Sequence, residues 1–276
     1  MVRTIRHSIW LLLAIVLIAG CEVISEKDRL IALDPQPTAT NARGQLLIEY
    51  TGVGCVNCPK AAQTAHELEQ LYDNLIVVAM HPKSNPFTKA SAKYDYTCAE
   101  ADVYYRFMDG QPTTPFPTGN LNITVSEDGT YFTDQTSWAA QLLAHRNDTA
   151  TVAIATAVEA GEGENEVKVS VYLSPKSSDI KPCRLMLWVT EDSIVGAQNM
   201  PDGSTNLEYV HNHMLRASLN GDWGEAVTFP NGEMLTKEGI YTLSDKWVRK
   251  NCRIVAVLID EETREAITAA KGALQL

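Results

Sequence analysis

The sequence is short of basic residues. It has 23 lysines and arginines against 34 aspartates and glutamates, which gives a formal net charge of −11. A surface of this sign repels the phosphates of nucleic acids and the headgroups of anionic lipids, so no nucleic-acid partner is expected. Beyond residue 20 the sequence also lacks an uninterrupted apolar run of membrane-spanning length. We therefore expect the rest of the chain to be soluble and at most anchored to a membrane.

The N-terminal residues predict an export signal. A short basic region is followed by an apolar run at 9–19 that is too short to span a bilayer. Ala19 and Gly20 directly before Cys21 resemble the lipobox of bacterial lipoproteins, in which the cysteine is acylated and the chain is cut just before it. The resemblance implies a signal peptide at 1–20 and an anchor in the lipid bilayer through acylated Cys21.

Residues 21–44 predict an extended tether, because they hold two prolines and a polar stretch. The acidic residues just after Cys21 resemble the tract that sends some lipoproteins of Bacteroides-type bacteria to the cell surface. An ordinary solvated tether is the alternative.

A strand, a helix and a second strand are predicted at the start of the ordered chain. Apolar runs at 46–50 and 75–80 favour buried strands, and Pro59 is well placed to begin the helix between them. This unit implies a parallel sheet with a right-handed crossover. Further along, we expect a helix over 86–108, a strand over 121–125 with a returning strand at 131–132, and a helix over 136–145.

After residue 148 the hydrophobic period changes from helical to alternating. Strands are predicted from this alternation over 167–173, 184–191, 253–260 and 265–269, with turn residues between them. Repeated short strands of this kind indicate an antiparallel β-sandwich of immunoglobulin or fibronectin type. We therefore expect two domains, an α/β domain at 45–148 and an all-β sandwich at 149–276.

Six cysteines are present, at 21, 55, 58, 98, 183 and 252. If Cys21 is acylated, five remain and at least one thiol is unpaired. An oxidising compartment favours a disulfide at the close pair Cys55 and Cys58. Cys98 falls on the apolar face of its predicted helix and is expected to be inert. Pairing of Cys183 with Cys252 is left open, since it requires their strands to be parallel or in different sheets.

The segment 46–58 resembles the active-site strand and turn of thioredoxin. Glu49 falls where that family has a buried acid, and Pro117 falls where it has a cis-proline facing the cysteines. The resemblance covers residues 45–147 and implies redox chemistry. Cys55 at a helix N-terminus would be the nucleophilic thiolate, Cys58 the resolving thiol and Glu49 the acceptor of its proton.

The neighbours of the cysteines depart from the thioredoxin pattern. Gly54 replaces the usual tryptophan, Val56 and Asn57 replace the Gly-Pro interior, and Pro59 follows the second cysteine. Redox potential depends on these neighbours. A static disulfide that closes the start of the helix is therefore the alternative interpretation.

Three further segments, 208–216, 221–225 and 255–258, resemble the twenty-eight-kilodalton outer-membrane protein family of Bacteroides-type bacteria. Members of that family are similar in having a thioredoxin-like half with Cys-x-x-Cys-Pro, a β-sandwich half and a lipoprotein signal. The resemblance implies an outer-membrane location, on the periplasmic face or the cell surface, and no assigned biochemical role.

Three histidines are candidates for binding. His211 and His213 alternate along a predicted strand, a spacing that can bind a metal ion, although a hydrogen-bonded loop anchor is the preferred interpretation. His81 follows the second predicted strand, at the sheet edge where parallel sheets place ligands, with a structural role as the alternative.

Two functional hypotheses follow. The favoured one is a lipoprotein that binds a protein, peptide or glycan partner and has a static Cys55–Cys58 disulfide. The alternative is a membrane-tethered thiol–disulfide oxidoreductase that acts through the same two cysteines, helped by Glu49 and Pro117. Neither hypothesis calls for a cofactor.

Overall fold

A computed structural model of the chain describes residues 42–88, 95–126 and 128–275, all within one compact unit. The predicted signal peptide, Cys21 and the tether up to residue 41 lie outside the described residues. Among the residues described, no helix is both long and apolar enough to cross a membrane.

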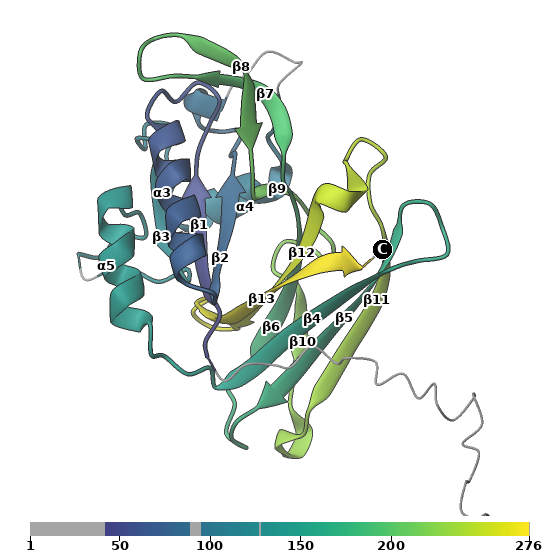
Figure 1. Cartoon of the computed structure of the whole chain (residues 1–276). Helices are drawn as coiled ribbons and strands as arrows, with labels where there is room; N and C mark the ends of the chain where they lie inside the picture. The colour runs from purple at the N-terminus through teal and green to yellow at the C-terminus, as the bar shows by residue number, and fades with distance from the viewer. Residues whose placement is uncertain (1–41, 89–94, 127, 276) are drawn as a thin grey trace, which may run out of the picture. The chain divides into compact units, whose positions relative to one another are not determined.

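The described chain is mostly β-sheet with a few helices (Figure 1). Ten strands follow one another across the main sheet, in the order β11 (Leu235–Thr242), β5 (Glu166–Pro175), β4 (Val152–Ala160), β13 (Ala266–Gln275), β12 (Cys252–Asp260), β6 (Cys183–Glu191), β9 (Met214–Ser218), β2 (Leu75–Met80), β1 (Gln45–Tyr50) and β3 (Thr118–Leu121). The short strand β10 (Glu225–Val227) also pairs with β6. A separate hairpin is formed by β7 (Ile194–Asn199) and β8 (Thr205–His211).

The predicted strand–helix–strand unit is confirmed. Strands β1 and β2 are parallel, with Gln45 opposite Leu75 and Tyr50 opposite Met80. Helix α3 (Cys58–Leu71) connects them, with proline in its first turn and alanines on its buried face. Because β1 and β2 are buried along their whole length, their sequences are continuously apolar apart from Gln45 and Glu49.

Three predicted elements of the first half differ from the structure. The expected helix over 86–108 is a 3-10 turn at Pro86–Thr88 and a helix α4 at Ala99–Phe107, with 89–94 outside the described residues. The expected strand over 121–125 instead ends at Leu121, because Asn122 and Ile123 both have positive φ. Residues 131–132 form no strand, and only an isolated bridge joins Thr133 to Gly119. Helix α5 (Gln135–His145) lies close to its predicted range, with Asp134 as its N-cap.

Strands β6 and β12 lie between two hydrophobic cores. Alternate residues of β12 point to opposite faces, so Ile254 and Leu258 pack with β4 and β5, whereas Val255 and Val257 pack with β1, β2 and α4. Both faces of these strands are therefore buried, which explains their long apolar runs.

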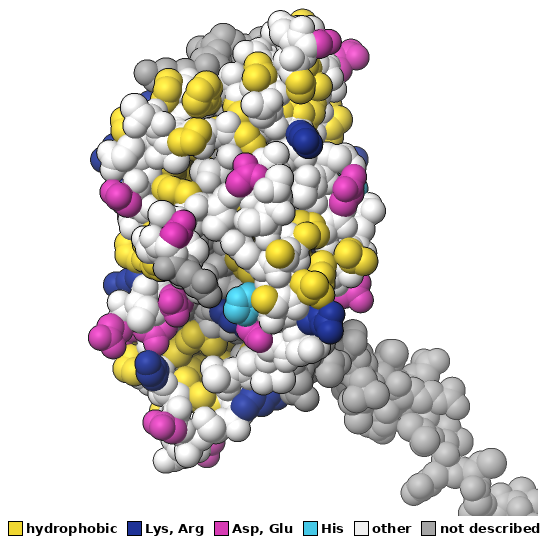
Figure 2. Space-filling model, turned by 90° about the vertical axis from the view of Figure 1, so that its left-hand side faces the viewer, with side chains coloured by type: hydrophobic (Ala, Val, Ile, Leu, Met, Phe, Trp, Pro, Cys, Tyr) yellow, Lys and Arg dark blue, Asp and Glu magenta, His cyan; other side chains and the backbone are white. Residues whose placement is uncertain are grey.

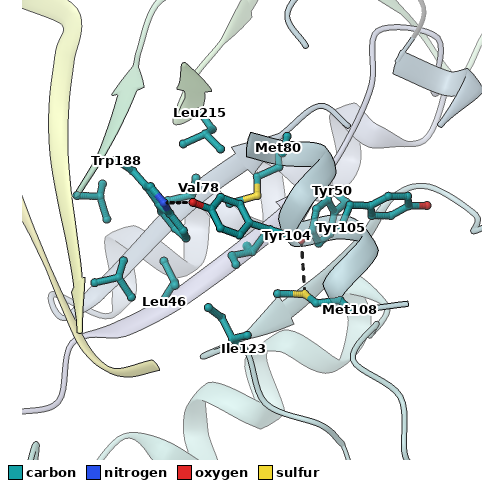
Figure 3. Packing of buried hydrophobic residues seen from close by; sticks show 14 of the residues in the cluster. Leu46, Tyr50, Val78, Met80, Tyr104, Tyr105, Met108, Ile123, Trp188 and Leu215 are labelled. Carbon is teal, nitrogen blue, oxygen red and sulfur yellow. Dashed lines mark hydrogen bonds between the residues drawn. The ribbon is translucent and has the colours of Figure 1, made fainter. Parts of the chain in front are cut away.

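The core that Val255 and Val257 enter contains a cluster of buried aromatic side chains. Figure 3 shows Trp188 of β6 beside Tyr104 of α4, with Tyr50, Tyr105 and Met108 further along the same core. These five side chains are at most 1% exposed. This core therefore contains side chains from residues before position 148 and from residues after it.

The main sheet also runs without a break past residue 148. Met214 of β9 lies in parallel register with Ala79 of β2, and the backbone N–H of Ala79 donates a hydrogen bond of 2.8 Å to the carbonyl of His213. The expected domain boundary at 148/149 is not marked by a gap in this sheet and stays a prediction.

On the face drawn in Figure 2, acidic and basic side chains are scattered among apolar ones. Lysines and arginines do not gather into a basic patch on this face. That distribution agrees with the excess of acidic residues in the sequence.

Candidate functional site

The cysteine turn lies where β1 ends and α3 begins. Its path is tight, since a Cβ atom added to Gly52 would lie 2.4 Å from the carbonyl oxygen of Phe87. The N–H of Gly54 donates to that same carbonyl at 2.8 Å. Glycine at 52 and 54 therefore lets the turn pass close to the backbone of residue 87.

Cys55 and Cys58 form a disulfide, with Cα atoms 5.4 Å apart. The bond is buried, because the two residues are 3% and 2% exposed. Both belong to the same hydrophobic core cluster as Phe116 and Tyr50.

The β7–β8 hairpin covers the cysteine turn. The side-chain amide of Gln198 donates to the carbonyl of Cys55 at 2.9 Å, and the backbone N–H of Asn199 donates to the carbonyl of Val53 at 2.9 Å. The hairpin follows β6 in the chain, so a segment from the second half closes over a turn from the first half. These hydrogen bonds hold the hairpin against the backbone of the cysteine turn.

Glu49 lies at the C-terminal end of β1 and is 2% exposed. Burial raises the pKa of its carboxyl group to about 8. Within the described residues, Oε1 of Glu49 has no hydrogen-bond partner. Burial, and after it the charge of Glu49, raises the pKa of Tyr209 on β8, and both residues line the same cavity.

Pro117 follows a cis peptide bond with Phe116, as expected for a proline at this place. The next residue, Thr118, begins β3 and lies in antiparallel register with Tyr50. The cis-proline therefore lies at the end of the sheet where β1 leads into the cysteine turn.

A cavity of about 420 Å³ opens beside Cys58. It lies among the start of α3, the ends of β1 and β2, and the chain between β8 and β9. Its polar or titratable lining residues are Glu49, Thr51, Cys58, Gln63, His66, His81, Gln198, Tyr209, His211, Asn212 and His213.

Two of the lining histidines are neutral at neutral pH. Burial, with a smaller contribution from His211, lowers the pKa of His81 to about 3, and burial lowers the pKa of His211 to about 4. Their rings are 6.3 Å apart between centroids. His211 is hydrogen-bonded to the carbonyl of Ala197 at 3.2 Å, whereas neither ring nitrogen of His81 has a partner among the described residues.

The structure separates the two histidines that the sequence paired as metal candidates. His211 ends β8 and is held by Ala197, whereas His213 lies in the turn before β9 and contacts Glu69 and Asp192. His213 instead joins His66 and Glu69 of α3. Sequence reasoning missed these two residues, although their spacing of three on a helix places them on one face.

The family described as "Outer membrane protein Omp28" matches residues 105–275 of this sequence. The chain belongs to the Omp28 family. The family membership predicted from the sequence motifs is thereby confirmed, and with it the outer-membrane location of an Omp28-family lipoprotein whose biochemical role is unassigned. Acylation of Cys21 itself stays a prediction.

Solved structures are similar to this Omp28-family chain at low sequence identity. HBP35 of Porphyromonas gingivalis is 17% identical with a TM-score of 0.66, over 86% of this chain and 76% of that one. A protein from Agrobacterium tumefaciens is 14% identical with a TM-score of 0.51, over 86% of this chain and 99% of that one. At sequence identities this low, the similarity shows only that the folds are alike. No curated protein matches the sequence.

The remaining described cysteines of this Omp28-family chain are free thiols. Strands β6 and β12 are antiparallel neighbours, with Cys183 opposite Asp260 and Cys252 opposite Glu191. The two cysteines therefore lie at opposite ends of the strand pair and do not form a disulfide. Burial raises the pKa of Cys98 to about 12, which disfavours its thiolate at neutral pH.

Proposed function

We propose that this Omp28-family chain is a binding protein of the outer membrane and that the cavity beside Cys58 holds part of its partner. A volume of about 420 Å³ is in the usual range for ligand pockets. The carboxyl group of Glu49 and the ring of His81 offer unpaired donors and acceptors there. Such a lining suits a polar segment of a peptide or glycan, which both donates and accepts hydrogen bonds.

Our proposal assigns the region 45–148 a thioredoxin-like fold and the region 149–276 a sandwich of immunoglobulin or fibronectin type. The parallel pair β1 and β2, the disulfide at the start of α3 and the cis peptide before Pro117 support the first assignment. The core between the β4–β5 pair and the β6–β12 pair supports the second.

Burial of the disulfide is the observation that carries the binding role. A redox-active pair needs one sulfur atom within reach of the substrate disulfide. Here Cys55 is 3% exposed, and its carbonyl is held by Gln198 from the hairpin above it. A bond covered in this way serves to fix the cavity wall around Cys58.

A pocket-filling variant tests the binding role. Ala62 lines the cavity from α3 and is half-buried, so Ala62→Phe fills the space and leaves the polar groups in place. The full-length protein in detergent is applied to peptide and glycan arrays. We expect binding that Ala62→Phe abolishes and that Leu143→Phe, an exposed site on α5, preserves. Equal binding by wild type and Ala62→Phe, or no binding to either array, contradicts the proposal.

A thiol–disulfide oxidoreductase is the second candidate, and Glu49 is the observation that favours it. A carboxyl group with a pKa near 8 beside Cys58 is partly ionised near neutral pH, and its ionised form can accept the proton of the resolving thiol. In that reaction the Cys55 thiolate attacks a substrate disulfide, and the Cys58 thiolate then displaces the reduced substrate as the Cys55–Cys58 bond reforms. The hairpin must open before either step.

The reduction potential of the pair separates the two candidates. We expect a value below about −300 mV, as for structural disulfides, and no turnover of a disulfide substrate. A value between about −270 and −120 mV, with turnover that Cys55→Ser abolishes, would replace the binding role by the enzyme.

A further inference from the structure

Three metal-ligating side chains meet at the rim of the cavity. His66 and Glu69 lie three residues apart on α3 and share a helix face. His213 reaches the same place from the turn between β8 and β9. One ligand atom from each of the three residues lies within 4.8 Å of the other two.

We propose that His66, Glu69 and His213 bind a divalent transition-metal ion, with Zn²⁺ the ion that suits them best. Two imidazoles and one carboxylate form a donor set that zinc commonly accepts, with a further position left for water or a ligand. Calcium and magnesium prefer oxygen donors alone and are disfavoured here.

The backbone holds His213 in place for this role. Its φ of +58° is uncommon for a residue other than glycine. Two hydrogen bonds of 2.8 Å fix the conformation, one from its N–H to a carboxylate oxygen of Asp192 and one from the N–H of Ala79 to its carbonyl. A turn restrained in this way presents the imidazole ring to α3.

The two nitrogens of the His213 ring face different carboxylates. Nδ1 lies 3.5 Å from Oδ1 of Asp192, whereas Nε2 lies 3.4 Å from Oε2 of Glu69. A histidine that binds a metal through one nitrogen usually has a carboxylate or carbonyl at the other, which fixes its tautomer. Asp192 occupies that orienting position, so Nε2 is the nitrogen directed toward the ion.

Two side chains compete for the same ligand atoms. The ammonium group of Lys271, from β13, contacts Oε1 of Glu69, and the side-chain nitrogen of Gln70 lies 2.9 Å from Nε2 of His66. Lys271 and Gln70 are both exposed and can rotate away. Lys271 supplies the positive charge that a bound cation would bring, so its removal should favour the ion.

The metal proposal does not depend on the binding role of the cavity. His66 and His213 line the cavity, so an ion held there faces into it. Zinc binding is nevertheless measured with the metal alone, without any peptide or glycan. Failure of one proposal therefore leaves the other standing.

The test is a titration of Zn²⁺ into the untagged full-length protein in detergent after chelator treatment, followed by calorimetry. We expect one ion per chain, and an affinity at least about tenfold weaker in His66→Ala, Glu69→Gln and His213→Ala. His66 is exposed, so its variant keeps the fold even if a change at His213 disturbs the turn. His145→Ala, an exposed histidine of α5 paired with Asp148, is the matched control and should bind as wild type does.

Lys271→Met supplies an independent readout, because it should strengthen zinc binding, whereas a nonspecific surface site would not respond. Co²⁺ titrated in place of Zn²⁺ should give visible absorption bands that disappear in His66→Ala. No saturable zinc binding by wild type, or an unchanged affinity in His66→Ala, overturns the proposal.

Discussion

The indole nitrogen of Trp188 on β6 donates a hydrogen bond of 2.8 Å to the hydroxyl group of Tyr104 on α4 (Figure 3). That hydroxyl group donates in turn to the carbonyl of Asp222. Both aromatic residues are at most 1% exposed, and their ring centroids lie 5.0 Å apart. Two consecutive hydrogen bonds thus lie in the apolar core to which residues before and after position 148 both contribute.

We expect Trp188→Phe to lower the free energy of unfolding by about 2 to 4 kcal/mol, because a buried hydrogen bond and part of a large ring are lost. Urea denaturation of wild type, Trp188→Phe, Tyr104→Phe and the double variant measures this loss and the coupling between the two residues. A change below about 0.5 kcal/mol in Trp188→Phe would show that the bond contributes little.

Glu49 should make the protein less stable as the pH rises. Its pKa is about 8 in the folded protein against an ordinary value of 4.5, so between these pH values the folded state binds a proton that the unfolded state does not. Stability is therefore full below about pH 4.5 and falls toward pH 8, by up to about 1.4 kcal/mol per pH unit. Urea midpoints from pH 5 to 8 should fall more steeply for wild type than for Glu49→Gln. Parallel curves would contradict the raised pKa.

His81 should make the protein less stable as the pH falls. Its folded pKa of about 3 lies below the ordinary histidine value of 6.5, so below pH 6.5 the unfolded state takes up a proton that the folded state excludes. Its contribution to stability is full above pH 6.5 and is lost as the pH falls toward 3. Acid unfolding of His81→Gln should therefore depend less on pH than that of wild type, whereas His145→Gln, at an exposed site, should follow wild type. An unchanged acid profile in His81→Gln would rule out this role.

Gln198 should protect the disulfide. Gln198→Ala removes hydrogen bonds to the carbonyls of Cys55 and Gly52, each worth about 1 kcal/mol, and loosens the hairpin over the cysteine turn. We expect dithiothreitol to reduce the bond several-fold to about tenfold faster in this variant, as measured by mass-resolved alkylation. Leu207→Ala, at a site 61% exposed on the same hairpin, should react at the wild-type rate. Equal rates in all three proteins would mean that the hairpin does not limit access.

Local patterns were sufficient to predict the unit from β1 to β2. The apolar runs at 46–50 and 75–80 and the proline at 59 act over a few residues, and each is satisfied within the unit itself. They failed after Leu121, where the side chain of Asn122 accepts a hydrogen bond of 2.8 Å from the backbone of Leu46. That contact joins residues 76 positions apart in the sequence, and the hydrophobic periodicity of a short segment cannot predict such a contact.

The alternating pattern of the second half predicted strands but not their neighbours. Cys183 and Cys252 each begin a long strand, and the pattern allows either a disulfide or two free thiols. Strands β6 and β12 pair in antiparallel orientation, so their first residues lie at opposite ends of the strand pair and both thiols are free.

The sequence by itself determined the motifs of the Omp28 family, the cysteine pair with its buried acid and proline, and the order of most elements, since each depends on neighbouring residues. Only the tertiary structure decided that the β7–β8 hairpin is hydrogen-bonded to the cysteine turn and that His213 reaches His66 and Glu69. These contacts join residues about 140 positions apart, and the pairing of β9 with β2, rather than any local motif, brings His213 to α3.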